Sequence, residues 1–145
     1  GVNSRLDSIQ AAILDVKLKL LDDYNNSRKK FAKMYTDLLS NNSKIIVPKF
    51  PKNHLSHVFH QYTLKITNKK RDALVNYLNE NGIPCGIYYP IPLHSQKAYS
   101  SIRNNDKNFK VTNKLCKEVI SLPMHTELDE DQIKFISNKV LEFIN

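Results

Sequence analysis

The chain has 145 residues, and 22 Lys and Arg against 14 Asp and Glu give it a formal charge of +8. Its 41% hydrophobic and 25% charged residues are typical of a globular domain with a core of its own, which excludes wholesale disorder. No run of about 18 apolar residues occurs, so no membrane-spanning helix is predicted. Two cysteines are too few for a disulfide scaffold or a four-cysteine zinc site, and we expect a cytoplasmic protein.

The positive charge raises the alternative of a nucleic-acid-binding module, because clustered Lys and Arg neutralise phosphates. Lysine supplies 18 of the 22 basic residues and is spread along the chain with 16 Asn, a composition that an AT-rich genome imposes. The densest basic stretch is 28–30 with Lys33, and helical spacing makes most of it a solvated face. We therefore expect no nucleic-acid partner, and a basic α+β binding module stays as an alternative.

The first forty residues carry a helical pattern. Apolar side chains recur with a period of about 3.6 residues over 6–20, and the pattern continues to Leu38. No Pro or Gly interrupts it, so one long helix fits, as do two helices with a bend near 22–23. Ser4 followed by Asp7 resembles a capping box at its start. The apolar stripe has no evident partner within the chain.

Residues 44–145 have the pattern of one small α+β domain. After a short strand at 45–47, period-two alternation predicts a strand at 57–66. Two more strands are predicted at 84–89 and 120–122, and helices at 69–81, 95–102, 110–119 and 129–143. The whole order is a long helix followed by β-α-β-α-β-α, a small sheet with helices packed on it.

A dense polar and aromatic cluster occurs at 86–94, with the sequence GIYYPIPLH. Tyr88, Tyr89 and His94 stand there on a loop stiffened by prolines, which loses little entropy when it binds a polar ligand. Composition alone leaves open the alternative that the tyrosines face the core and the prolines only turn the chain.

Two other sets of residues have side chains that are capable of chemistry. His57 and His60, with His94, are possible metal ligands, but no carboxylate or cysteine accompanies them at ligand spacing, so we expect no metal site. Cys85 and Cys116 lie among apolar residues, and we expect both in the core as inert side chains.

Four segments carry a specific resemblance: 1–12 (GVNSRLDSIQAA), 57–62 (HVFHQY), 82–94 (GIPCGIYYPIPLH) and 121–124 (SLPM). In this order and at these separations they resemble the C-terminal part of the DegT-type (DegT/StrS) sugar aminotransferases. Those are pyridoxal 5'-phosphate (PLP) enzymes of the aspartate-aminotransferase fold that aminate nucleotide-linked keto-sugars. The resemblance covers essentially the whole chain.

The resemblance implies an enzyme of α/β class and fold type I, active as a homodimer. In it, 44–145 would form the C-terminal small domain, and 1–43 a long helix at the interdomain or dimer interface. The larger domain, with the Schiff-base lysine, would lie upstream of Gly1, and no lysine here stands in a matching context. We therefore expect a fragment that contains no catalytic residue and is inactive alone.

The resemblance also assigns binding residues. Asn3 and Arg5 match the segment that reaches the partner's cofactor phosphate, for which an amide and a guanidinium are suited. The residues that would border the substrate are His60, Tyr62, Tyr88, Tyr89 and His94. Many relatives have histidine where Tyr88 stands, and we expect this difference to alter which sugar is accepted.

The implied substrates are a nucleotide-linked keto-sugar and glutamate or glutamine as amino donor, in cell-surface polysaccharide or amino-sugar biosynthesis. A PLP-dependent sugar dehydratase of the same fold, which has histidine in place of the Schiff-base lysine, is a further alternative. Nothing in the C-terminal residues separates the two.

Overall fold

A three-stranded antiparallel sheet in the order β1-β2-β3 lies at the centre of the computed structural model, which describes residues 6–51, 57–102 and 106–145. The strands are β1 (Ile45–Ile46), β2 (Tyr62–Ile66) and β3 (Val119–Leu122). The helices are α1 (Ser8–Leu18), α2 (Leu21–Leu39), α3 (Arg71–Glu80), α4 (Lys110–Glu118) and α5 (Glu130–Ile144). Three 3₁₀ turns, at Leu93–Ser95, Lys97–Ile102 and Asp106–Phe109, precede α4.

The N-terminal helical region is two helices, and the break lies at 19–20 rather than at 22–23. Asp22 and Asp23 instead occupy the first turn of α2, where their carboxylates face the positive end of the helix dipole. Asp7 is the N-cap of α1, and its side chain accepts a hydrogen bond from the Gln10 amide (2.8 Å). Ser4, the other half of the predicted capping box, lies outside the described residues.

The strands are shorter than predicted. Residues 57–61 are not paired, so β2 begins only at Tyr62. The strand predicted at 84–89 is reduced to a single bridge between Gly86 and Ser121. Proline has no amide hydrogen to donate to a ladder, and Pro84 and Pro90 flank this segment, which limits its pairing. The helix predicted at 95–102 is made of 3₁₀ turns.

Other helix boundaries are close to the predictions. Gly82 has a positive φ of 73° directly after α3, the backbone conformation in which a glycine ends a helix. Asp129 begins α5 with a full capping box, in which it accepts from the Gln132 amide (2.7 Å) while the Gln132 side chain accepts from the Asp129 amide (3.0 Å).

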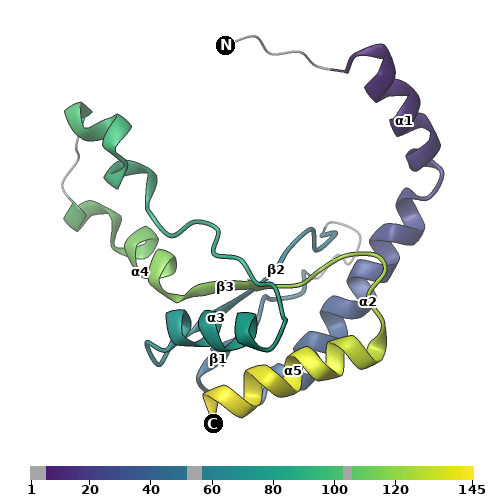
Figure 1. Cartoon of the computed structure of the whole chain (residues 1–145). Helices are drawn as coiled ribbons and strands as arrows, with labels where there is room; N and C mark the ends of the chain where they lie inside the picture. The colour runs from purple at the N-terminus through teal and green to yellow at the C-terminus, as the bar shows by residue number, and fades with distance from the viewer. Residues whose placement is uncertain (1–5, 52–56, 103–105) are drawn as a thin grey trace.

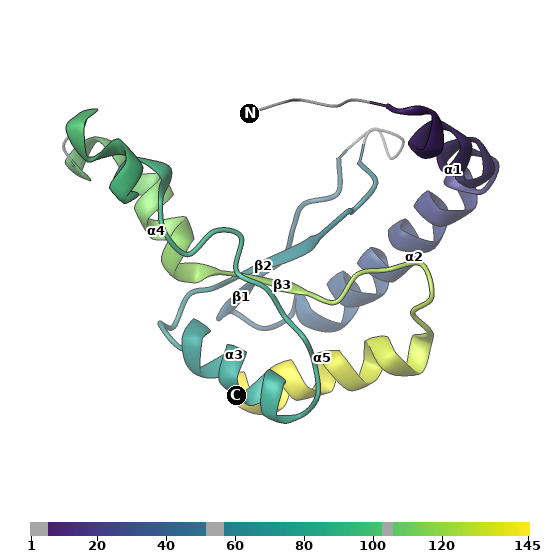
Figure 2. The ribbon, with the colours of Figure 1, turned by 45° about the horizontal axis from the view of Figure 1, so that its top comes forward.

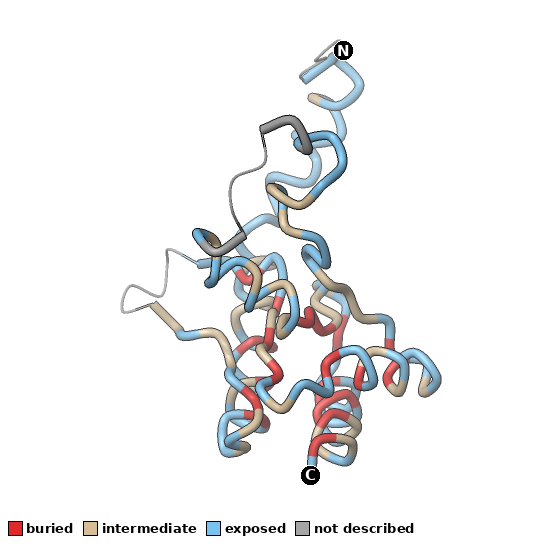
Figure 3. The backbone as a smooth tube through the Cα atoms, turned by 90° about the vertical axis from the view of Figure 1, so that its left-hand side faces the viewer, coloured by how far each residue is buried: buried red, intermediate tan, exposed pale blue. Residues whose placement is uncertain are grey.

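The core lies between the sheet and α2, α3 and α5. In β2 the buried residues Tyr62, Leu64 and Ile66 share one face of the strand, and they belong to one cluster with apolar side chains of these three helices. Figure 3 shows the buried residues gathered in this part of the molecule, away from the N-terminal helix. The free energy of burying these side chains therefore holds the sheet to three of the five helices.

α1 and α4 lie outside this core. No residue of either helix is buried. The two helices project from opposite sides of the sheet, with α1 continuing beyond α2 (Figure 1), and the turned view shows the same separation (Figure 2). Within the described ranges, no helix is long and apolar enough to cross a membrane.

Candidate functional site

The two tyrosines of the predicted substrate segment lie on a loop after α3. Gly86 is held against β3 by two backbone hydrogen bonds with Ser121, of 3.0 and 2.7 Å. The side chain of Tyr88 folds back over Gly86, where a Cβ would lie 2.7 Å from three of its atoms, so the close approach requires glycine. Tyr88 and Tyr89 are 51% and 73% exposed. Neither is a core residue, which resolves the alternative that the sequence left open.

Tyr88 and His60 line one cavity of about 340 Å³, here named the His60 cavity. Its wall also includes Gln61, Cys85, Ser121 and Met124. An exposed imidazole, an amide and a phenol supply hydrogen-bond donors and acceptors at its surface. The structure thus brings together two of the predicted substrate residues, although they are 28 positions apart in the sequence.

A second cavity of about 540 Å³ lies between the tyrosines and α4 and is here named the α4 cavity. Its wall is mainly apolar and includes Tyr88, Tyr89, Ile91, Leu93, Leu115 and Cys116. Because Tyr88 lines both cavities, it lies at the boundary between a more polar cavity and a more apolar one. A ligand with a polar and an apolar part suits this arrangement.

The remaining predicted substrate residues lie elsewhere. The ring of His94 stacks on Phe109 with a centroid distance of 4.3 Å, and His94 lines neither cavity. Tyr62 has no exposed surface, and its hydroxyl oxygen lies 2.8 Å from Thr36 Oγ1. Its ring stacks on Tyr35 at 4.9 Å, and burial raises the pKa of Tyr62 to about 12. Tyr62 is therefore a core residue, because β2 directs it to the covered face of the sheet, and this corrects its assignment to the substrate.

Asn3 and Arg5, expected at the cofactor phosphate, lie outside the described residues. His57 is engaged locally, since its Nδ1 accepts a hydrogen bond from the Phe59 amide (2.9 Å) and its ring packs on the Phe59 ring. Across 6–51, 57–102 and 106–145, no three His, Cys, Asp or Glu side chains are grouped to hold a metal ion.

Both cysteines are free and half-buried. Cys85 packs against the core, as expected, and burial raises the pKa of its thiol, which lowers its reactivity. Cys116 instead lines the α4 cavity, so its expected place in the core is wrong. It lies on α4, a helix with no buried residue.

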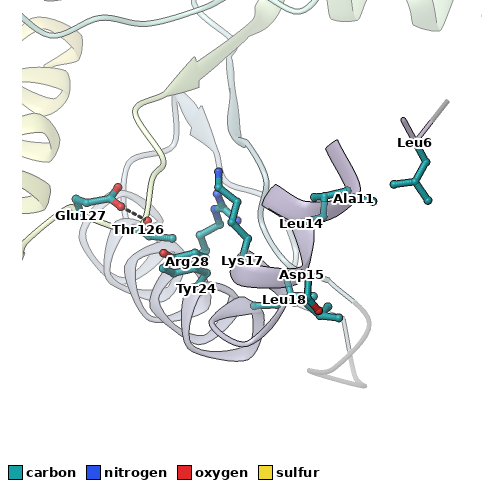
Figure 4. Close-up of a pocket in the computed structure, with 11 residues that line it drawn as sticks. Leu6, Ala11, Leu14, Asp15, Lys17, Leu18, Tyr24, Arg28, Thr126 and Glu127 are labelled. Atoms are coloured by element: carbon teal, nitrogen blue, oxygen red, sulfur yellow. Dashed lines mark hydrogen bonds between the residues drawn. The ribbon is translucent and has the colours of Figure 1, made fainter. Parts of the chain in front are cut away.

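A larger groove of about 690 Å³ separates α1 from α2 and residues 126–127 and is here named the α1 groove. Figure 4 shows the side chains that line it, with Leu14 and Leu18 on α1 and Tyr24 and Arg28 on α2. Arg28 Nε is buried without a hydrogen-bond partner in the described part of the chain. Burying a donor without a partner costs about 1–3 kcal/mol, so a group that accepts a hydrogen bond from Arg28 would stabilise this groove.

Sequence reasoning missed Gly86, Arg28 and Arg71, and rarity was the signal that could have found them. The chain has only three glycines, and arginine supplies four of its 22 basic residues. Where lysine is the default cation, a retained arginine marks a place that needs a planar guanidinium with several donors. Arg71 is 6% exposed and Arg28 reaches the α1 groove, so both described arginines occupy such places.

The basic stretch at 28–33 is partly neutralised. Lys30 pairs with Glu130 of α5 (2.9 Å) and Lys33 with Asp37 (2.6 Å), both on exposed surface. The Lys30 ammonium lowers the pKa of the Glu130 carboxyl through their hydrogen bond. These pairs fit the solvated helix face expected from the sequence.

Comparison with known proteins decides the family. The model of the DegT/DnrJ/EryC1/StrS aminotransferase family matches residues 1–141. The chain belongs to this family. A relative described as a pleiotropic regulatory protein of Geobacillus stearothermophilus is 42% identical over 145 residues, which is 99% of this chain and 38% of the relative. The dTDP-3-amino-3,6-dideoxy-alpha-D-galactopyranose transaminase of Aneurinibacillus thermoaerophilus is 37% identical over 100% of this chain and 37% of its own length.

Solved structures of the family extend the likeness to the fold. The S. venezuelae protein DesV, crystallised with a ketimine intermediate, has a TM-score of 0.91 and 30% identity over 100% of this chain and 38% of its own. NtdA of Bacillus subtilis, with bound cofactor PMP, has a TM-score of 0.84 and 26% identity over 99% and 34%. These likenesses confirm the expected α+β unit of a fold type I aminotransferase. The chain spans about 38% of the curated relatives and matches their C-terminal part.

Proposed function

We propose that this chain is the C-terminal part of a PLP-dependent aminotransferase that transfers an amino group to a nucleotide-linked keto-sugar. The observation that carries the proposal is the family match over 1–141, which includes a named dTDP-sugar transaminase at 37% identity. Glutamate or glutamine would be the amino donor. Such an enzyme would act in the cytoplasm, in cell-surface polysaccharide or amino-sugar biosynthesis.

The substrate would lie at the His60 and α4 cavities. His60 and Tyr88 can exchange hydrogen bonds with sugar hydroxyls or with the pyrophosphate, and Tyr89 presents an exposed ring against which a sugar or base packs. His94, stacked on Phe109, would support the far end of the loop. The phenol of Tyr88, at the boundary of both cavities, would help to determine which sugar fits.

The described residues do not fit PLP by themselves. The cofactor needs a lysine for its aldehyde, an acid for its ring nitrogen and donors for its phosphate. Neither the His60 cavity nor the α4 cavity is lined by a lysine. Lys17 lines the α1 groove, but its neighbours there are mainly apolar. We propose that Asn3 and Arg5 help to bind the phosphate of a cofactor that is held chiefly by the large domain. When bound, this cofactor would supply the electron sink for transamination.

α1 would be covered in the complete homodimer. Its apolar side chains are exposed, among them Ile9 (76%), Val16 (66%) and Leu18 (66%). So many exposed apolar side chains are unusual for a helix whose final environment is solvent. Arg28 Nε, which has no hydrogen-bond partner among the described residues, supports the same proposal from the α1 groove. We propose that residues 1–43 lie at the interdomain or dimer interface and that 44–145 form the small domain.

The test uses the full-length enzyme with dTDP- and UDP-linked keto-sugars and glutamate. We expect an aminated sugar nucleotide and one 2-oxoglutarate for each amino group transferred. A dehydrated sugar, formed without consumption of the donor, would establish the dehydratase instead. The 145-residue chain alone, mixed with PLP, should give no absorbance band that borohydride fixes to a lysine. A stable, reducible band would contradict the assignment of the lysine to another domain.

A further inference from the structure

A buried arginine connects the two elements on which the tyrosine cavities rest. Arg71 is the first residue of α3 and is 6% exposed, although its guanidinium is permanently charged. Its Nη1 donates to the carbonyl oxygen of Val119 (2.7 Å) and its Nη2 to that of Cys116 (3.0 Å), both more than 40 positions along the chain. Its Nε donates to the carboxylate of Asp72 (2.6 Å). All three side-chain nitrogens are therefore hydrogen-bonded.

The place of this charge is explained by α4 rather than by α3. A cation in the first turn of a helix faces the positive end of its own helix dipole, so α3 does not stabilise Arg71. α4 ends at Glu118, and the carbonyl of Cys116 is one of its last four, which lack partners inside the helix. A guanidinium there satisfies a free carbonyl and meets the negative end of the dipole. Arg71 thus caps α4 from a different helix.

α4 depends on such an anchor because none of its residues is buried. The same guanidinium holds Val119, where β3 begins. Two residues further along β3, Ser121 pairs with Gly86, which lies directly under Tyr88. Arg71 is therefore bonded to the end of α4, which forms one wall of the α4 cavity, and to the start of β3, which supports the loop that forms the other wall. Figure 1 shows α4 running directly into β3.

We propose that Arg71 is a positioning residue for the substrate site. It fixes the junction between α4 and β3 to the start of α3, and so determines the direction in which α4 leaves the sheet and the room that the His60 and α4 cavities leave for the sugar nucleotide. The inference rests on the proposed function for its kinetic consequence only. A lysine places one ammonium where the guanidinium reaches two carbonyls with separate nitrogens, so it replaces the arginine only in part.

Hydrogen exchange on the chain itself tests the anchoring without any activity. In Arg71→Met, we expect amides of 88–118 to exchange about tenfold faster, because two charge-assisted hydrogen bonds are lost, while those of α5 keep their rates. Arg71→Lys should fall between this variant and the wild type, and it decides the matter if Arg71→Met does not fold. Equal acceleration throughout the chain, or none in 88–118, would overturn the proposal.

Two matched variants separate positioning from general stability. Asp72→Asn weakens the bond to a carboxylate that is 83% exposed and leaves both carbonyl bonds in place, so exchange in 88–118 should stay as in the wild type. Ile136→Val trims the core on α5, away from α4, and should accelerate exchange of α5 but not preferentially of 88–118. If Ile136→Val reproduces the pattern of Arg71→Met, the proposal is wrong.

Steady-state kinetics of the full-length enzyme test the consequence. Arg71→Lys should raise KM for the nucleotide-linked sugar about tenfold, while KM for glutamate and the PLP absorbance per subunit stay unchanged. If KM for the sugar and KM for glutamate rise together and the subunits also lose PLP, Arg71 has a purely structural role. That result would contradict the proposal. If the wild-type enzyme transaminates no keto-sugar, the proposed function fails, and the exchange pattern alone then decides whether Arg71 anchors α4.

Discussion

Replacing Tyr62 by phenylalanine distinguishes a core residue from a substrate residue. Thr36 Oγ1 donates its only proton to the Ala32 carbonyl (2.9 Å), so the Tyr62 hydroxyl must be the donor in the 2.8 Å bond to Thr36. Tyr62→Phe removes this bond and leaves an acceptor unused, which costs about 1 kcal/mol of unfolding free energy. Thr36→Val leaves the phenol proton buried without an acceptor and costs about 2–3 kcal/mol.

The assay is urea unfolding followed by circular dichroism, with the two single variants and the double variant in one cycle. Removing both partners leaves no unpaired phenol, so the double variant should cost about 1 kcal/mol less than the sum of the singles. Tyr88→Phe is the matched control, because Tyr88 is 51% exposed and its hydroxyl makes no hydrogen bond within the described residues. It should change stability by less than about 0.5 kcal/mol.

In the full-length enzyme the two variants should behave in the opposite way. Tyr62→Phe should leave KM for the nucleotide-linked sugar unchanged, whereas Tyr88→Phe should raise it. The reasoning is refuted if the cycle is additive within about 0.3 kcal/mol, or if Tyr62→Phe raises KM while unfolding is unaffected.

Three further predictions concern other parts of the molecule. Burial raises the pKa of Tyr62 from its usual 10 to about 12, so its neutral form contributes fully to stability below pH 10. That contribution is lost as the pH rises towards 12. The urea midpoint should therefore fall less steeply with pH over this window in Tyr62→Phe than in the wild type. Gly86→Ala should displace the Tyr88 ring and raise KM for the sugar severalfold while costing less than about 1 kcal/mol of stability; an unchanged KM would argue against a substrate role of Tyr88. Val16→Glu should change the stability of the 145-residue chain by less than about 0.5 kcal/mol but disrupt the full-length dimer in size-exclusion chromatography, and an intact dimer would show that this face is not buried.

Local chemistry was sufficient for several features. The Asp129 cap and the end of α3 at Gly82 depend on neighbours within a few positions, so the sequence predicted them to within a few residues. For the N-terminal region it left one long helix or two open, and the structure has two. The sequence predicted a strand at 84–89 and left the exposure of Tyr88 and Tyr89 open, although prolines that cannot extend a ladder favour the loop found there. The family resemblance, which rests on four separated segments, was confirmed over residues 1–141.

Long-range contacts decided the rest. Period-two alternation put Tyr62, Leu64 and Ile66 on one face of a strand, but only the packing of α2, α3 and α5 determined that this face is the core. Likewise Arg71 has the sequence context of an ordinary solvated helix start, and its role depends on carbonyls more than 40 positions away. Periodicity reports which residues share a face, whereas burial and hydrogen-bond partners depend on what covers that face, and that is settled only when the chain folds.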